Sequence, residues 1–99
     1  MSNKTEHGQA TADRIIQAGL ELWRNDPASV SARRIGKILG MKHNGILYHF
    51  GDITDLKDAI AQEAVRIGDK AIVPGLIVNR HPSVADMSES DRATYLSGF

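Results

Sequence analysis

Several features are missing from this 99-residue sequence, and each absence removes a class of protein. There is no cysteine, which excludes a disulfide framework and any metal site built on thiolates. No apolar run approaches the ~18 residues that a membrane-spanning helix needs. The opening stretch, MSNKTEHGQATAD, lacks the apolar segment of a secretory signal. We therefore expect a cytoplasmic protein that does not enter a membrane.

The motifs of common enzyme classes are missing as well. The chain has no glycine-rich phosphate loop and no His-Glu-x-x-His pattern, and it has no thiol nucleophile. His43 and His49 are six residues apart on an expected helix, so they face different directions, and no further ligand type joins them. The acids from Asp52 to Asp58 fall at an expected helix start, where they favour the helix dipole. We therefore expect no enzyme activity, no cofactor and no bound metal.

What the sequence does contain is a balanced but unevenly distributed charge. Twelve Lys and Arg residues match twelve Asp and Glu residues, so the formal net charge is zero. Residues 1–50 hold seven cations against four acids, whereas residues 51–99 hold five against eight. This separation is expected when one surface meets phosphate and another does not. A chain of this length forms a single domain with a small core.

The stretch SARRIGKILGMKHNGILYHF, residues 31–50, has the pattern of two short helices joined by a tight turn. Ser31 can cap the first helix through its hydroxyl, and Ile35 and Ile38 belong to an apolar face at helical spacing. Gly40 follows the last apolar position, where helices commonly end in a left-handed residue. The stretch contains four cations and no acid. A short helix, a glycine-containing turn and a second helix with a basic start predict a DNA-reading helix-turn-helix.

The rest of the chain also predicts helices. Residues 11–24 carry an apolar stripe at 3.6-residue spacing. A long helix follows the helix-turn-helix, capped by Asp52 or Thr54, and we expect Pro74-Gly75 to end it. No β-hairpin signal is present. The sequence therefore predicts an all-α fold, with a three-helix head, a long connecting fourth helix and a short C-terminal helical segment.

The expected organisation has three parts. Residues 1–10 read as a flexible N-terminal arm, and residues 11–51 as the helix-turn-helix head. Residues 52–99 hold the connecting helix and a C-terminal dimerisation segment. The motif Ser88-Glu89-Ser90-Asp91 resembles a capping box and places a last helix in that segment.

The order of these elements resembles the DNA-binding head of the tetracycline-repressor (TetR-like) family. The resemblance runs over about residues 11–70 without a gap. It is carried by Arg14-Ile15-Ile16 with Ala18, Leu22 and Trp23, by Ser31 to Gly36 with Leu39-Gly40-Met41, and by Gly45 to Phe50 with Asp55-Leu56.

The sequence also departs from the family pattern. Leu47 stands where the family most often has tyrosine, and Tyr48 follows one place later. Ile53 stands where a lysine usually contacts phosphate. The family's second domain, which binds small effectors and dimerises, has no counterpart in the 25 residues after Pro74. The resemblance therefore implies DNA binding but not ligand sensing.

We expect the side chains at the start of the second helix of the motif to recognise the DNA sequence. Lys42, His43 and Asn44 are expected at base edges in the major groove, where Asn pairs with adenine and Lys donates to guanine. Gly45 lacks a side chain and allows a close approach to the groove. Arg33 matches a family position that reaches a base, and its planar guanidinium suits guanine.

Further side chains are expected to contact phosphates, which fix the register without reading sequence. They are Ser31, Arg34, Lys37, Tyr48 and His49. Two plainer interpretations stay open: each cation can be a solvated surface charge, and Tyr48 can belong to the core or to an interface.

One such head contacts too few bases for tight recognition, so we expect a homodimer on a palindromic operator. The C-terminal end is expected to provide the interface, because it would otherwise expose a large apolar patch. The residues assigned to it are Ile67, Ala71, Ile72, Leu76, Ile77, Tyr95, Leu96 and Phe99. The sequence thus predicts a transcriptional regulator, most simply a repressor of double-stranded operator DNA without a small-molecule pocket, controlled by its own concentration or by a protein partner.

Two other functions stay open at this point. The chain can be the DNA-recognition subunit of a phage packaging or plasmid-maintenance complex, which would form a larger oligomer with weak sequence preference. It can also be a protein-interaction module that pairs with a full-length regulator, although such a module need not keep the basic cluster from Arg33 to Asn44. The sequence is equally compatible with a fragment of a longer effector-binding regulator.

Overall fold

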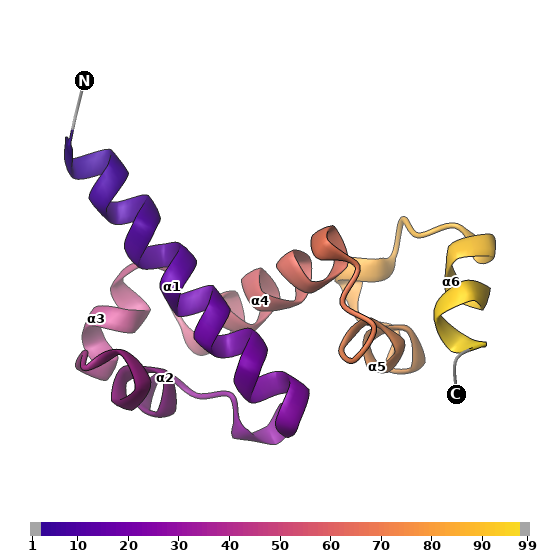
Figure 1. Ribbon diagram of the computed structural model, residues 1–99, viewed down its shortest axis with the longest axis horizontal. Coiled ribbons are helices and arrows are strands. Elements are labelled where there is room, and N and C mark those ends of the chain that lie inside the picture. Colours follow the sequence, from indigo (N-terminus) through magenta and orange to yellow (C-terminus); the bar gives the residue numbers. More distant parts are fainter. Residues whose placement is uncertain (1–2, 98–99) are drawn as a thin grey trace. The chain divides into compact units, whose positions relative to one another are not determined.

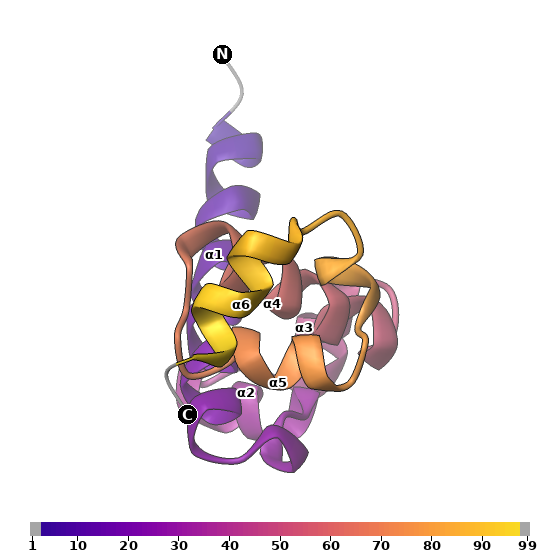
Figure 2. The same ribbon diagram turned by 90° about the vertical axis from the view of Figure 1, so that its right-hand side faces the viewer.

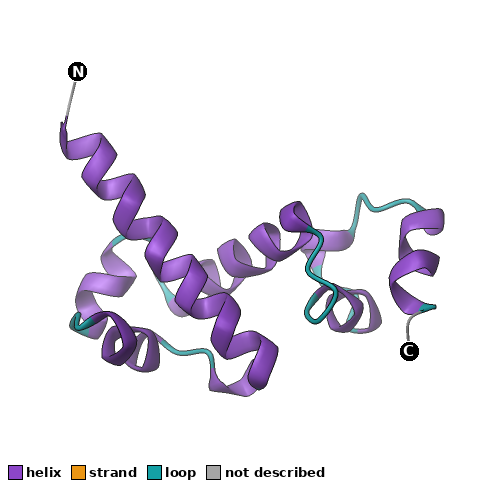
Figure 3. Ribbon diagram, viewed as in Figure 1, coloured by secondary structure: helices purple, strands orange, loops and turns teal. Residues whose placement is uncertain are grey.

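The computed structural model describes residues 3–97, and these residues form helices and connecting loops without a strand (Figures 1 and 3). The helices of this range are α1 (Asn3–Asn25), α2 (Ala32–Leu39), α3 (His43–Tyr48), α4 (Ile53–Ile67), α5 (Val73–Val78) and α6 (Glu89–Leu96), with 3₁₀ turns η1 (Pro27–Ser29) and η2 (Pro82–Val84). The predicted all-α class is therefore confirmed. None of the described helices has the length and apolar character to cross a membrane.

The chain divides into two compact units, and the division falls inside α4, between Ile60 and Ala61. The first unit holds α1, η1, α2, α3 and the first half of α4, and the second unit holds the remainder. The boundary expected after residue 51 lies earlier than this division. Leu56 and Ile60 are fully buried, so the first turns of α4 add to the core of the helix-turn-helix unit.

The first unit is held together by apolar side chains from all of its α-helices. α1 packs on α2, and α2 packs on α3. Ile15, Ile35 and Ile46 have no exposed surface. At Gly19, a Cβ atom would lie 2.3 Å from Ile60 Cδ1, so α1 approaches α4 at a distance that leaves no room for a side chain unless Ile60 moves. These contacts fix the platform that presents α2 and α3.

Helix α1 begins at Asn3, eight residues before the start expected at Thr11. The expected arm of residues 1–10 is therefore helical from Asn3 onward, while Met1 and Ser2 lie outside the described residues. No proline interrupts this stretch, and the single Gly8 lowers helix stability by only about 1 kcal/mol relative to alanine. The polar composition suggested an arm, but it contains nothing that stops a helix.

The end of α4, in the second unit, differs from the helix end predicted from the sequence. α4 ends at Ile67, and Gly68 follows in the left-handed conformation with a φ of 67°. The Asp69 carboxylate accepts hydrogen bonds from the backbone N–H groups of Ala71 and Ile72, at 2.9 and 3.0 Å, and shapes the turn into α5. Pro74 then lies in the first turn of α5, where the missing N–H of proline costs nothing. The expectation that Pro74-Gly75 ends the fourth helix was wrong.

Helix α6 is attached through polar contacts more than through burial. Ser88 caps it by accepting from the Asp91 N–H at 3.1 Å, which confirms the predicted cap. The Arg92 guanidinium donates to the carbonyl oxygens of Val84 at 2.7 Å and Met87 at 3.2 Å. No residue of α6 is fully buried. α6 packs beside α5, as the two views in Figures 1 and 2 show.

The second unit also carries an ion pair between Arg66 and Glu63 on α4. Arg66 donates from Nη2 to Glu63 Oε2 at 2.7 Å. This hydrogen bond from Arg66 lowers the pKa of Glu63 below its ordinary value.

The apolar residues assigned to a dimer interface are divided between core and surface. Ile72, Leu76 and Ile77 are only 1, 3 and 7% exposed, because α5 turns its apolar face into the chain itself. Their assignment to a partner surface was therefore wrong. Of the other assigned residues, Ile67, Ala71 and Leu96 are exposed, Tyr95 is half-buried, and Phe99 lies outside the described residues.

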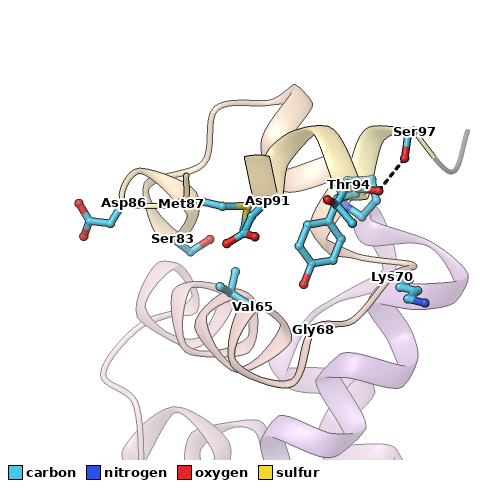
Figure 4. Close-up of a pocket in the computed structure, with 11 residues that line it drawn as sticks. Val65, Gly68, Lys70, Ser83, Asp86, Met87, Asp91, Thr94 and Ser97 are labelled. Atoms are coloured by element: carbon cyan, nitrogen blue, oxygen red, sulfur yellow. Dashed lines mark hydrogen bonds between the residues drawn. The ribbon is translucent and has the colours of Figure 1, made fainter. Parts of the chain in front are cut away.

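The second unit contains a half-open pocket of about 780 Å³. The residues that line it come from the end of α4, the following turn, α5, η2, the loop between η2 and α6, α6 and the residue after it (Figure 4). The expectation of a chain without a small-molecule pocket was drawn from the missing second domain, and as a statement about ligand binding it stays a prediction. α4, η2 and α6 together form a concave surface that local sequence patterns do not reveal.

Candidate nucleic-acid interface

The helix-turn-helix is shaped by a cap at each end of α2. The Ser31 hydroxyl accepts from the backbone N–H of Arg34 at 3.1 Å, which satisfies one donor of the first turn. At the other end, Gly40 adopts a left-handed conformation with a φ of 70°. The Met41 N–H then donates to the Gly36 carbonyl at 2.8 Å and closes the helix end. Both local predictions, the Ser31 cap and the Gly40 exit, are confirmed.

A second glycine brings α2 against the turn. A Cβ atom on Gly36 would lie 2.4 Å from the carbonyl oxygen of Met41, a distance that real Cβ atoms do not adopt. The backbone of α2 therefore touches the backbone of the turn, and this contact directs the chain into α3. This role of Gly36 was not predicted from the sequence, although a glycine inside a helical pattern often has a packing reason.

Helix α3 packs on the first unit through one buried side chain, and its first residues lie outside the core. Ile46 has no exposed surface and fixes the helix on the first unit. Lys42 occupies the N-cap position without a side-chain cap hydrogen bond. Lys42, His43 and Asn44 are all exposed. Within the described residues, none of these three side chains takes part in a hydrogen bond or an ion pair that would give it a structural role.

Gly45 differs from Gly36 in what a side chain would meet. A Cβ atom on Gly45 would lie 3.6 Å from Met41 Cε, which is an ordinary van der Waals contact. The fold therefore does not require a glycine at position 45. A requirement for glycine there would come from something outside the chain, such as a groove that α3 enters.

The exposed side of α2 carries cations that the protein does not neutralise. Arg33, Arg34 and Lys37 are exposed, and the first turns of α2 and α3 contain no acid. In the described part of the chain, no salt bridge involves these cations or Lys42. Four positive charges are therefore carried by α2 and the start of α3, where they can meet phosphate.

Large hydrophobic side chains also lie on the surface of this unit, among them Tyr48 and Ile38. Tyr48 is 86% exposed, and its ring lies edge-on to His49 with the ring centroids 5.7 Å apart. The alternative that Tyr48 belongs to the core is therefore wrong. Ile38 is 51% exposed, contrary to its expected place on the apolar face, because it lies outside the buried stripe of Ala32, Ile35 and Gly36.

The start of α4 limits how far phosphate contacts extend. Asp52 Oδ1 accepts from the Asp55 N–H at 2.9 Å, and Asp55 Oδ2 accepts from the Asp52 N–H at 3.4 Å. Asp52 is therefore the cap, and two carboxylates occupy the helix start. Ile53, the first residue of α4, is 37% exposed. Negative charge here disfavours phosphate, so contacts with DNA are expected from α2 and α3.

Comparisons of the chain with protein-family models, with curated proteins and with solved structures found no match. The structure also shows no group of three His, Asp or Glu side chains that could hold a metal ion, within the residues it describes.

Proposed function

We propose that this chain is a sequence-specific DNA-binding regulator of the cytoplasm, most simply a repressor that binds a palindromic operator as a homodimer. The observation that carries the proposal is the acid-free helix-turn-helix. Its four exposed cations have no salt-bridge partner in the described residues, and the first side chains of α3 are not used by the fold. The likeness of residues 11–70 to the tetracycline-repressor head supports the same function, and we propose that relationship as well.

Each part of the surface has its own role in this proposal. Lys42, His43 and Asn44 read bases from the start of α3, and Arg33 reads a further base from α2. Phosphate contacts come from Ser31, Arg34, Lys37, Tyr48 and His49. Tyr48 can reach a phosphate or a sugar because nearly all of its side chain is exposed. Gly45 allows the helix axis to lie close to the groove floor.

The homodimer is proposed to form through the second unit. Ile67, Val78 and Leu96 expose 44, 67 and 37% of their surfaces there. Pairing two copies doubles the number of bases read and matches a twofold symmetric site. A protein partner that covers the same side chains would be the alternative means of control.

The experiment that tests the proposal measures binding to the DNA that flanks the protein's own coding region. Wild type and Asn44→Ala are compared at two salt concentrations. We expect tight binding to one palindrome, weaker at the higher salt because counterions are released on binding. Asn44→Ala should weaken binding by about 1–3 kcal/mol and relax the preference for adenine at one position.

Two control variants separate specific loss from general loss. Asn79→Ala removes an exposed asparagine from the second unit, and Lys70→Ala removes an exposed cation there. Both should bind DNA as wild type does. Weak binding to every sequence, unchanged by Asn44→Ala, would contradict base reading and favour a packaging or interaction module.

A further inference from the structure

The pocket of the second unit combines an apolar wall with polar groups on one helix. Val65 from α4, Pro74 from α5 and Met87 from the loop before α6 supply apolar surface. Asp91 and Tyr95 line the pocket from α6. These two residues are four apart, so they lie on the same side of the helix, one turn from each other. The volume of about 780 Å³ falls in the range of pockets that hold drug-sized molecules.

Two polar side chains of this wall form no hydrogen bond within the described residues: Asp91, which is exposed, and Tyr95, which is half-buried. Figure 4 shows Asp91 projecting from α6 toward Val65. The backbone N–H of Asp91 donates to Ser88, but its carboxylate has no hydrogen bond or ion pair within the described residues. The Tyr95 hydroxyl lies 3.2 Å from where a Cβ of Gly68 would be, and it too lacks a hydrogen-bond partner in this part of the chain. An acceptor and a hydroxyl are therefore available to a ligand.

Neighbouring cations do not cancel the charge of Asp91. The guanidinium of Arg92, the next residue, is engaged by the carbonyl oxygens of Val84, Met87 and Ala85. Lys70 is the cation among the lining residues, and it forms no salt bridge with Asp91. Because the Asp91 carboxylate lies beside apolar lining residues and is not paired with either cation, the pocket favours a ligand that is apolar with one positive group.

We propose that this pocket binds a small molecule that has an apolar body and a protonated amine. The amine lies at Asp91 within reach of the Tyr95 hydroxyl, and the body covers Val65, Pro74 and Met87. This proposal uses only residues of the second unit. It therefore stands or fails independently of DNA binding by the first.

Three probes with the same ring test the proposal on the full chain. Tryptamine carries a cation, 3-ethylindole carries no charge, and indole-3-propionate carries an anion. Binding is followed by the shifts of backbone amide resonances in the ¹⁵N-labelled protein. We expect saturable shifts around Gly68 and Asp91, with tryptamine bound about three- to fivefold more tightly than 3-ethylindole, as for an exposed ion pair. Indole-3-propionate should bind most weakly.

Asp91→Asn should remove the preference for the cation and leave the binding of 3-ethylindole unchanged. Glu89→Gln is the matched control, because it removes an exposed acid of α6 that does not line the pocket. The comparison of three probes in the wild-type chain decides the question even if a variant fails to fold. Equal binding of all three probes, or no saturable shift in the second unit, would overturn the proposal.

Discussion

At the scale of single residues, two glycines of the helix-turn-helix differ in whether the fold requires them. Gly36 faces a backbone oxygen at 2.4 Å, whereas Gly45 faces a flexible methionine end at 3.6 Å. Alanine is a better helix former than glycine by about 1 kcal/mol. Replacing glycine with alanine should therefore stabilise the helix at position 45. At position 36 the cost of the backbone shift should exceed this stabilisation.

We predict that Gly36→Ala destabilises the protein by about 1–3 kcal/mol through overpacking. Gly45→Ala should leave stability unchanged or raise it by up to about 1 kcal/mol, and weaken operator binding. Urea unfolding and a DNA titration of both variants check this. A Gly45→Ala variant that binds the operator as wild type does would show that α3 does not approach the groove closely.

Some residue-scale features were visible in the sequence, and others were not. The Ser31 cap and the left-handed Gly40 depend on neighbours in the chain, so their pattern alone predicted them. Gly36 meets Met41 across a turn, and Ile38 faces outward because of which side α1 covers. Such contacts depend on the path of the whole backbone.

At the scale of elements, the N-cap residue of α2, Ser31, has both a structural role and a proposed functional role. Ser31 accepts from the Arg34 N–H, and it is also proposed to contact phosphate. Aspartate can make the same cap and adds a favourable charge at a helix start. The same charge repels DNA.

We predict that Ser31→Ala lowers the stability by about 1 kcal/mol, whereas Ser31→Asp keeps it. The affinity for DNA should follow the reverse order: Ser31→Asp should bind more weakly than Ser31→Ala, to the same extent for every DNA sequence. Thermal unfolding and titrations with operator and unrelated DNA measure both quantities. If Ser31→Asp binds DNA with the affinity of the wild type, no phosphate lies near the first turn of α2.

The helices of the second unit were harder to predict than those of the first. A proline-glycine pair reads as a helix end, yet Pro74 opens α5, because the chain has already turned at Gly68 and Asp69. α6 was predicted from its Ser88 cap. The pocket beneath it could not be predicted, since it requires α4, η2 and α6 to meet.

At the scale of the whole molecule, the proposed dimer assigns different tasks to the two units. Val78 is 67% exposed in the second unit, and Ile38 is 51% exposed in the first. A charge at either position is compatible with the fold, because neither side chain belongs to the core. The two positions therefore make a matched pair for separating assembly from DNA contact.

We predict that Val78→Glu shifts the protein from dimer to monomer and weakens operator binding through lost pairing. Ile38→Glu should keep the dimer and weaken DNA binding by repulsion at α2. Sedimentation velocity over a concentration series measures assembly, and a DNA titration measures binding. A wild-type chain that sediments as a monomer at every concentration would remove the dimer from the proposal.

The seating of α3 has a consequence for protein engineering. The position of α3 is fixed by the contact between Gly36 and Met41 and by the buried side chain of Ile46. None of these three residues belongs to the exposed start of α3. Lys42, His43 and Asn44 contribute no side-chain contact to this arrangement in the described residues. A library that randomises these three positions should therefore retain the scaffold in most of its members, so that selection can act on the preferred DNA sequence with little interference from folding.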